Sequence, residues 1–244
     1  SGGILTVSPG NVLTANDQFD WTGGNLLGAG TTTVSGTLTI SGGNNKFLGE
    51  YGNNGHTLIN NDAASFSGGT LYMVDSGTGD LAANITNNGT FHATDDADIL
   101  LYYYPNGGNQ PSFTNNDTFT KSGAATATEI GVAFNNLGTV NVDSGILSLS
   151  AGGMSTGGVF AVDAGATLYF GGSHSLDTSS SLSGAGNVDF FNGTTAIDGT
   201  YNVTGTTIVS GGTANFNVSA TAGSIALSGG ILTVSPGNVL TAND

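Results

Sequence analysis

The sequence predicts an all-β fold, a right-handed parallel β-helix (β-solenoid) of about ten coils with roughly 22 residues in each. Three observations support this prediction. A segment of 17 residues occurs twice without a change, at residues 1–17 and 228–244. Two shorter phrases, a glycine-led strand and an Asn-Asn turn, return along the chain. Between clusters of Gly, Asn, Asp and Ser, apolar and polar residues alternate with a period of two, which is typical of short strands.

The perfect repeat sets the organisation of the chain. Residues 1–227 form one full period of a tandem β-solenoid repeat, and residues 228–244 begin the next period. Chance does not produce identity over 17 consecutive positions, and a stack of coils is a shape to which further coils can be added. Since the chain begins and ends within the same phrase, we expect the native polypeptide or its assembly to continue at both ends.

Short strands are expected along the whole chain, and no window keeps the period of 3.6 residues that an α-helix requires. In the first part, strands are expected within residues 31–40 on both sides of a Ser-Gly turn, and at residues 46–51, 57–59, 64–66 and 70–74. Beyond residue 84, coils are expected to open near Ile85, Phe113, Phe134, Val159, Leu182, Tyr201 and Phe216. A sandwich or barrel would instead show turn signals about every 8 to 12 residues.

Each recurring phrase has a physical role in a stack of coils. Equivalent residues of successive coils lie about 4.8 Å apart, so apolar side chains form ladders inside the stack. The expected inward residues are Ile4, Leu38, Ile40, Leu71, Phe91, Phe119, Val140, Leu147, Leu149, Val162, Leu168, Val188, Val203 and Val218. Gly-Gly and Asn-Asn corners provide left-handed backbone geometry, and stacked Asn amides can bond to one another along the axis.

The composition excludes several classes of partner. The formal net charge is −15, with 17 acidic residues against Lys46 and Lys121 alone. Such a surface repels phosphate, so we expect no nucleic-acid binding and no attraction to anionic lipid. The longest apolar run, residues 99–104, is far shorter than the ~20 residues that span a bilayer, so we expect no membrane insertion. The chain has no Cys and therefore no disulfide.

The phrases resemble the β-strand repeats of large bacterial surface proteins, among them the passenger regions of autotransporters and filamentous-haemagglutinin-like adhesins. The likeness is closest over residues 84–217, and residues 134–149 and 182–190 are typical of it. The resemblance implies export to the extracellular space or the cell surface, a right-handed β-helix, and a role in stalks, adhesion or matrix. It implies no catalytic residue.

Two segments are candidates for a site. Asp95, Asp96 and Asp98 could bind Ca²⁺, which takes six to eight oxygen ligands, and the alternative is a solvated acidic turn. Tyr102, Tyr103 and Tyr104 belong to the least repeat-like segment, and exposed aromatic rings there could stack on sugars or contact neighbouring fibres. Trp21 is a further candidate for such contacts. For these aromatic residues the alternative is that they cover the flank of the solenoid.

An enzyme is not expected. Polysaccharide lyases need cationic groups, and this chain has two lysines and no arginine, whereas a glycosidase needs two carboxylates about 5 to 9.5 Å apart. Asp95 with Asp96, or Asp189 with Asp198, would be such a pair, although surface acids on turns are the simpler interpretation. His56, His92 and His174 lie in separate coils without the spacing of zinc ligands.

The sequence thus predicts a structural repeat unit of a long extracellular fibre, stalk or sheath that extends head to tail, with copies of itself as partners. The alternative hypothesis is an adhesin module that binds surface glycans or partner cells through the Tyr-rich insertion near residues 95–110. No cofactor is expected besides Ca²⁺.

Overall fold

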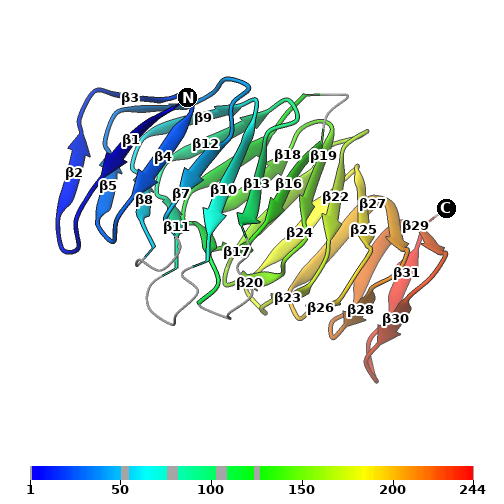
Figure 1. The fold of residues 1–244 in the computed structure, drawn as a ribbon. Helices are drawn as coiled ribbons and strands as arrows, with labels where there is room; N and C mark the ends of the chain where they lie inside the picture. Colours follow the sequence, from blue (N-terminus) through cyan, green and yellow to red (C-terminus); the bar gives the residue numbers. More distant parts are fainter. Residues whose placement is uncertain (1, 51–54, 76–81, 103–108, 124–126, 244) are drawn as a thin grey trace.

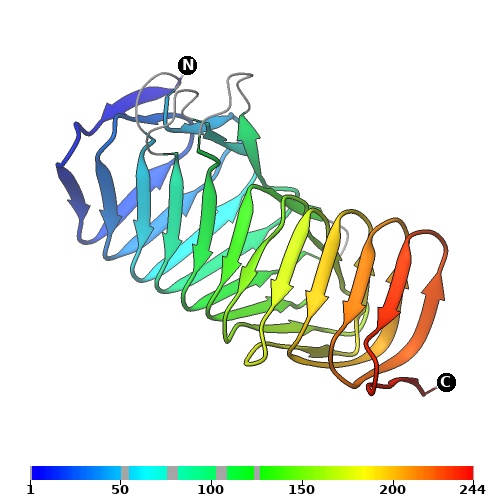
Figure 2. The same ribbon diagram turned by 90° about the horizontal axis from the view of Figure 1, so that it is seen from below.

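The computed structural model describes residues 2–50, 55–75, 82–102, 109–123 and 127–243. These residues form an all-β, right-handed parallel solenoid of about 11 turns of roughly 21 residues, which confirms the predicted fold class. Figures 1 and 2 show an elongated stack with the first coil at one end and the last coil at the other. Each turn contributes three short strands, and each strand pairs in parallel with its equivalents in the turns before and after it.

We call the three columns of strands ladders A, B and C, in the order in which the chain visits them. Ladder A opens each turn. It consists of β1 (Gly3–Thr6), β4 (Gly24–Leu27), β7 (Lys46–Leu48), β10 (Thr70–Val74), β13 (Asp98–Tyr102), β16 (Ala127–Gly131), β19 (Ile146–Leu149), β22 (Thr167–Phe170), β25 (Asn187–Phe190) and the C-terminal parts of β27 (Thr200–Val209) and β29 (Ala220–Leu227).

Ladder B follows in each turn and is a separate sheet of 11 strands. It consists of β2 (Val12–Ala15), β5 (Thr31–Val34), β8 (Thr57–Asn60), β11 (Asn84–Asn87), β14 (Ser112–Asn115), β17 (Ala133–Asn136), β20 (Gly153–Ser155), β23 (Ser173–Leu176), β26 (Thr194–Ile197), β28 (Thr213–Phe216) and β30 (Ile231–Val234).

Ladder C closes each turn. It consists of β3 (Gln18–Trp21), β6 (Thr37–Ile40), β9 (Ala63–Ser67), β12 (Thr90–Thr94), β15 (Thr118–Lys121), β18 (Thr139–Val142), β21 (Val159–Val162), β24 (Ser181–Gly184), the N-terminal parts of β27 and β29, and β31 (Leu240–Ala242). The long strands β27 and β29 pass directly from ladder C into ladder A, and so join these two ladders into one sheet.

The core is a set of apolar columns that run along the axis. All but two of the predicted inward residues are buried. Val218 is partly buried against the core, and Ile4 was predicted wrongly, because its side chain is 68% exposed. Counted from its glycine pair, Ile4 matches the outward Thr70, whereas Leu5 matches the buried Leu71.

Aromatic rings stack where a column carries Phe in consecutive turns. The rings of Phe91 and Phe119 lie 5.5 Å apart and nearly parallel, and those of Phe113 and Phe134 lie 5.3 Å apart. Such pairs add about 0.5–1.5 kcal/mol each to the burial of their area. The coil repeat therefore places identical side chains at a spacing that suits ring stacking.

An asparagine column stabilises the corner between ladders B and C, as the sequence predicts. The buried side chains of Asn60, Asn87, Asn115 and Asn136 form a chain in which each Nδ2 donates to the next Oδ1, at 2.8, 2.8 and 2.9 Å. Each amide also donates to backbone carbonyls, as Asn115 does to Asp117 O and Thr139 O. From Asn87 onward each buried amide oxygen is satisfied by the preceding amide, whereas Asn60 Oδ1 at the start of the column has no hydrogen-bond partner among the described residues. The column thus binds successive turns together.

The predicted coil openings fall in successive turns, but they do not all belong to the same ladder. Ile85, Phe113 and Phe134 are in register in ladder B. Val159, Leu182 and Tyr201 belong to ladder C, and Phe216 returns to ladder B. The series changes ladder because all three strands of a turn show the same alternation, whereas the longer interval from Ile85 to Phe113 lies within ladder B and reflects a longer turn. In the predicted strand at residues 46–51, Tyr51 lies outside the described residues.

Candidate functional site

The acidic cluster, which consists of Asp95, Asp96 and Asp98, forms hydrogen bonds with the backbone of the following turn. Asp96 Oδ1 accepts a hydrogen bond from Ala127 N at 3.0 Å, and Asp98 Oδ1 accepts one from Glu129 N at 2.8 Å. Burial raises the pKa of Asp98, and the Glu129 N–H bond partly opposes this. Both carboxylates therefore satisfy backbone N–H groups at the start of β16.

Asp95 provides the corner of this cluster. It has a φ of 57°, the left-handed region, and its carbonyl oxygen accepts a hydrogen bond from Lys121 Nζ at 3.0 Å. Among the described residues, no group of three or more His, Cys, Asp or Glu side chains is placed to hold a metal ion. Calcium binding by Asp95, Asp96 and Asp98 remains a prediction. In the structure the carboxylates of Asp96 and Asp98 accept hydrogen bonds from backbone N–H groups, and Asp95 contacts Lys121 through its carbonyl oxygen.

Both lysines of the chain are buried inside corners. Lys46 Nζ donates to Gly42 O, Asn44 O and Gly68 O, at 3.0 to 3.3 Å. Lys121 Nζ donates to Asp95 O and to Ser122 O at 2.7 Å. Burial lowers the pKa of both ammonium groups, and for Lys121 the nearby Asp96 and Asp95 act in the opposite direction. The described outer surface therefore carries acidic side chains and no Lys or Arg.

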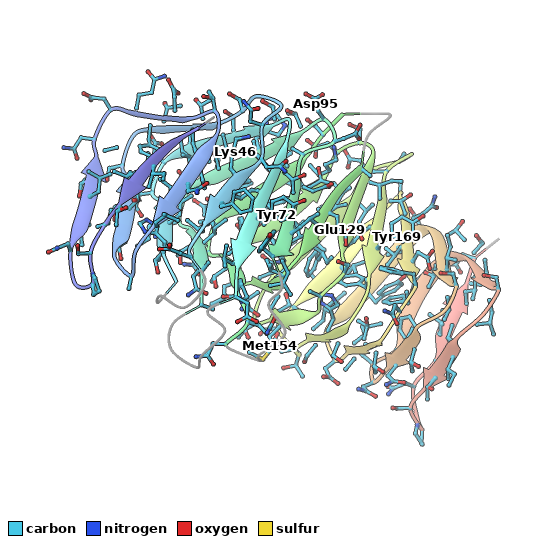
Figure 3. All side chains as sticks on the ribbon, in the orientation of Figure 1. Lys46, Tyr72, Asp95, Glu129, Met154 and Tyr169 are labelled. Carbon is cyan, nitrogen blue, oxygen red and sulfur yellow. The ribbon has the colours of Figure 1, made fainter. Side chains whose placement is uncertain are left out.

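An outward aromatic cluster lies on ladder A. Phe47 and Tyr72 stack at 5.2 Å on neighbouring strands, and the ring of Tyr102 meets each of them edge-on at 5.5 Å. Tyr102 is 39% exposed, and with Phe47 it lines a shallow hollow of about 210 Å³ that also includes Asn25 and Glu50. Figure 3 shows Tyr72 on the same long face as Glu129 and Tyr169.

The other predicted aromatic contacts are placed differently. Trp21 lies in the core, where it is 4% exposed and its Nε1 donates to Gly24 O at 3.3 Å. Its side chain offers little surface to a glycan, although it lines a hollow of about 230 Å³ in the first coil together with Leu5 and Phe19. Tyr103 and Tyr104 lie outside the described residues. Sequence reasoning missed Phe47 and Tyr72, which the pairings of β7 with β10 and of β10 with β13 bring to Tyr102.

The other acidic and histidine candidates form hydrogen bonds or close contacts with residues of the same or a neighbouring turn. Asp189 accepts a hydrogen bond from Ser210 Oγ at 2.7 Å, and Asp198 accepts one from Asn217 Nδ2 at 2.8 Å, each from the following turn. The buried ring of His174 contacts Phe170 at 4.9 Å, and its Nε2 lies 3.1 Å from Leu149 O. These groups stabilise neighbouring turns.

The duplicated segment lies on different ladders in its two copies. β1 in the first copy belongs to ladder A, whereas the identical residues of the second copy form β30 in ladder B. In the same way β2 belongs to ladder B, and its copy β31 belongs to ladder C. Inward and outward positions are nevertheless preserved, since Ile4 and Ile231 both point outward with 68% and 59% exposure.

The two copies also use opposite edges of the same strand for pairing. β1 pairs with β4, which follows it in the chain, whereas β30 pairs with β28, which precedes it. One sequence therefore forms ladder hydrogen bonds with a preceding turn in one place and with a following turn in the other. This makes the duplicated segment the strongest candidate for a self-association site.

Comparisons with family models, with curated proteins and with solved structures gave no match for this chain. The described part of the chain contains no helix with the length and apolarity needed to cross a membrane. The features of this chain that bear on its function are the stack of parallel coils, the outward aromatic cluster and the duplicated segment.

Proposed function

We propose that this chain is a structural repeat unit of a long extracellular β-solenoid fibre, stalk or sheath that extends head to tail. The observation that carries the proposal is the duplicated segment, which pairs with a preceding turn as β30 and with a following turn as β1. A strand that can pair on both edges allows one period to continue into the next without a break in the ladders. The likeness to bacterial surface proteins supports a place outside the cell.

Electron microscopy of chains with one, two and three periods tests this proposal. At about 4.8 Å per turn, one period of ten turns and a fraction adds about 50 Å of length. We expect straight rods that lengthen by this amount for each added period, at constant width. Compact particles, or rods joined by bends at the period boundary, would contradict head-to-tail continuity.

A second candidate is an adhesin module that binds surface glycans. The outward aromatic cluster supports it, because the exposed ring of Tyr102, beside the half-buried rings of Phe47 and Tyr72, offers a stacking face for a sugar next to the polar side chains of Asn25 and Glu50. The test is a glycan array with the native chain, a Tyr102, Tyr103 and Tyr104 triple alanine variant, and Tyr72→Ala. Tyr169→Ala is the matched control, since Tyr169 is another outward aromatic residue of ladder A. A signal that survives both cluster variants would exclude this site.

A further inference from the structure

The number of turns in a period follows from the ladders that the two copies occupy. β1 lies in ladder A of the first turn, and β30 lies in ladder B of the eleventh, since ladder B has one strand in each of 11 turns. The chain therefore advances by ten complete turns and one further strand out of three. We propose that one 227-residue period comprises ten and one third turns, so that each period is rotated about the axis by a third of a turn relative to the one before it. This inference rests on the proposed function, since it requires successive periods to stack.

The rotation determines which strands meet at the junction. In a tandem chain, β30 takes the place of the next period's β1, so β31 takes the place of its β2. The next strand to enter ladder A is then the copy of β3, which lies in ladder C in the first period. The C-terminal part of β29 therefore pairs with Gln18–Trp21 of the following period.

The side chains at this junction are complementary. Ile225 and Leu227 pair in register with the buried Thr207 and Val209, so they point inward, yet they are 38% and 61% exposed at the last turn. In the rotated arrangement they meet the inward Phe19 and Trp21 of the next period, which line the hollow in the first coil. The junction thus removes apolar side chains on both sides from water, which favours stacking.

An unrotated array has a different junction. A whole number of turns would place the copy of β1 in ladder A, and residues 224–227 would then become part of a corner rather than a strand. The copy of β3 would stay in ladder C, beside the N-terminal part of β29. Asp20 of the second period would lie next to Thr221 in that arrangement, and next to Ala226 in the rotated one, since all three side chains point outward.

Cysteine pairs separate the two arrangements, because the chain has no cysteine of its own. The chain to use is residues 1–244 followed directly by a second copy of residues 18–244, with Asp20→Cys in the second copy. Ala226→Cys in the first copy tests the rotated junction, and Thr221→Cys tests the unrotated one. Ile208→Cys with Ala226→Cys is the control, since these positions are paired in the structure. Opposite residues of neighbouring strands lie about 4.8 Å apart, within the range for a disulfide.

The expected result is oxidation of the Ala226 and Asp20 pair to the same extent as the control, with less than a tenth of that extent for the Thr221 pair. Disulfide formation by the Thr221 pair instead would overturn the rotation and leave head-to-tail stacking intact. If the control pair forms and neither junction pair does, the second period does not stack, and both the rotation and the proposed function fail.

Discussion

The asparagine column shows how much a single buried residue contributes to a stack of turns. Asn115 donates to three acceptors and accepts from Asn87, so its side chain joins three successive turns. Replacing it removes four hydrogen bonds from a buried site, while Asn87 Nδ2 keeps Gly89 O and Thr118 O, and Asn136 Oδ1 keeps Gly138 N. A hydrogen bond of this kind contributes about 0.5–1.5 kcal/mol net.

We therefore expect Asn115→Ala to lower the free energy of unfolding by about 2–4 kcal/mol. The next residue gives a matched control. Asn116 forms a similar bond to Asn88 at 2.7 Å, but it is exposed, so water can replace the lost partner. Urea unfolding followed by circular dichroism should show a large shift of midpoint for Asn115→Ala and a small one for Asn116→Ala. Equal shifts would contradict a special role for the buried column.

His174 makes the stability depend on pH. Burial lowers the pKa of its imidazole to about 4 in the folded chain, against about 6.5 in the unfolded chain. Between these values the unfolded state binds a proton that the folded state does not. The free energy of unfolding therefore falls as the pH falls from about 6.5 towards 4, by about 1.4 kcal/mol for each pH unit. Burial also lowers the pKa of His56, which acts in the same direction.

Urea unfolding at several pH values between 6.5 and 4 checks this expectation. The side chain of a His174→Gln variant cannot take up a proton. The free energy of unfolding of this variant should therefore change less steeply with pH than that of the native chain, by up to about 1.4 kcal/mol for each pH unit. Parallel pH profiles for the native chain and the variant would show that His174 is not the group responsible.

At the scale of elements, the corners decide how closely the turns approach. A Cβ added to Gly89 would overlap the carbonyl oxygen of Asp62 in the preceding turn, whereas a Cβ added to Gly43 would meet nothing within 4 Å. We expect Gly89→Ala to destabilise the fold by about 1–3 kcal/mol, because the backbone has to shift. Gly43→Ala should be close to neutral. Thermal unfolding of both variants is the measurement, and a neutral Gly89→Ala would show that the corner can widen freely.

Sequence patterns predicted the kinds of element in this chain, but not the ladder to which each strand belongs. Period-two alternation and recurring Gly-Gly and Asn-Asn phrases were enough to predict the solenoid, its coil length and the asparagine column. They did not assign strands to ladders, because the three strands of a turn share one alternation, as Phe216 and Tyr201 show. Nor did they find the contact of Phe47 and Tyr72 with Tyr102, since it depends on register between turns that are about 25 residues apart.

At the scale of the whole molecule, one turn is a unit that can be removed. Thr167 and Asn187 are paired in successive turns, so deleting residues 168–187 removes a complete turn and joins Thr167 to Val188 in register. In repeat architectures each turn contacts mainly its neighbours, so we expect this variant to fold with slightly reduced stability. Deleting residues 168–177 is the control, because half a turn places Thr178 and Ser180 where the core requires Leu168 and Phe170. Circular dichroism and the cooperativity of urea unfolding distinguish the two, and similar behaviour of both deletions would contradict the argument.

The burial of both lysines has a consequence for digestion. Trypsin-like proteases require an accessible Lys or Arg side chain, and this chain has Lys46 and Lys121 alone, each fully covered by its corner. The folded molecule therefore presents no bond that such an enzyme can cut, and the first scission has to wait until a corner opens. Incubation with trypsin, followed by mass spectrometry, should leave the chain whole under native conditions and yield fragments ending at both lysines in urea.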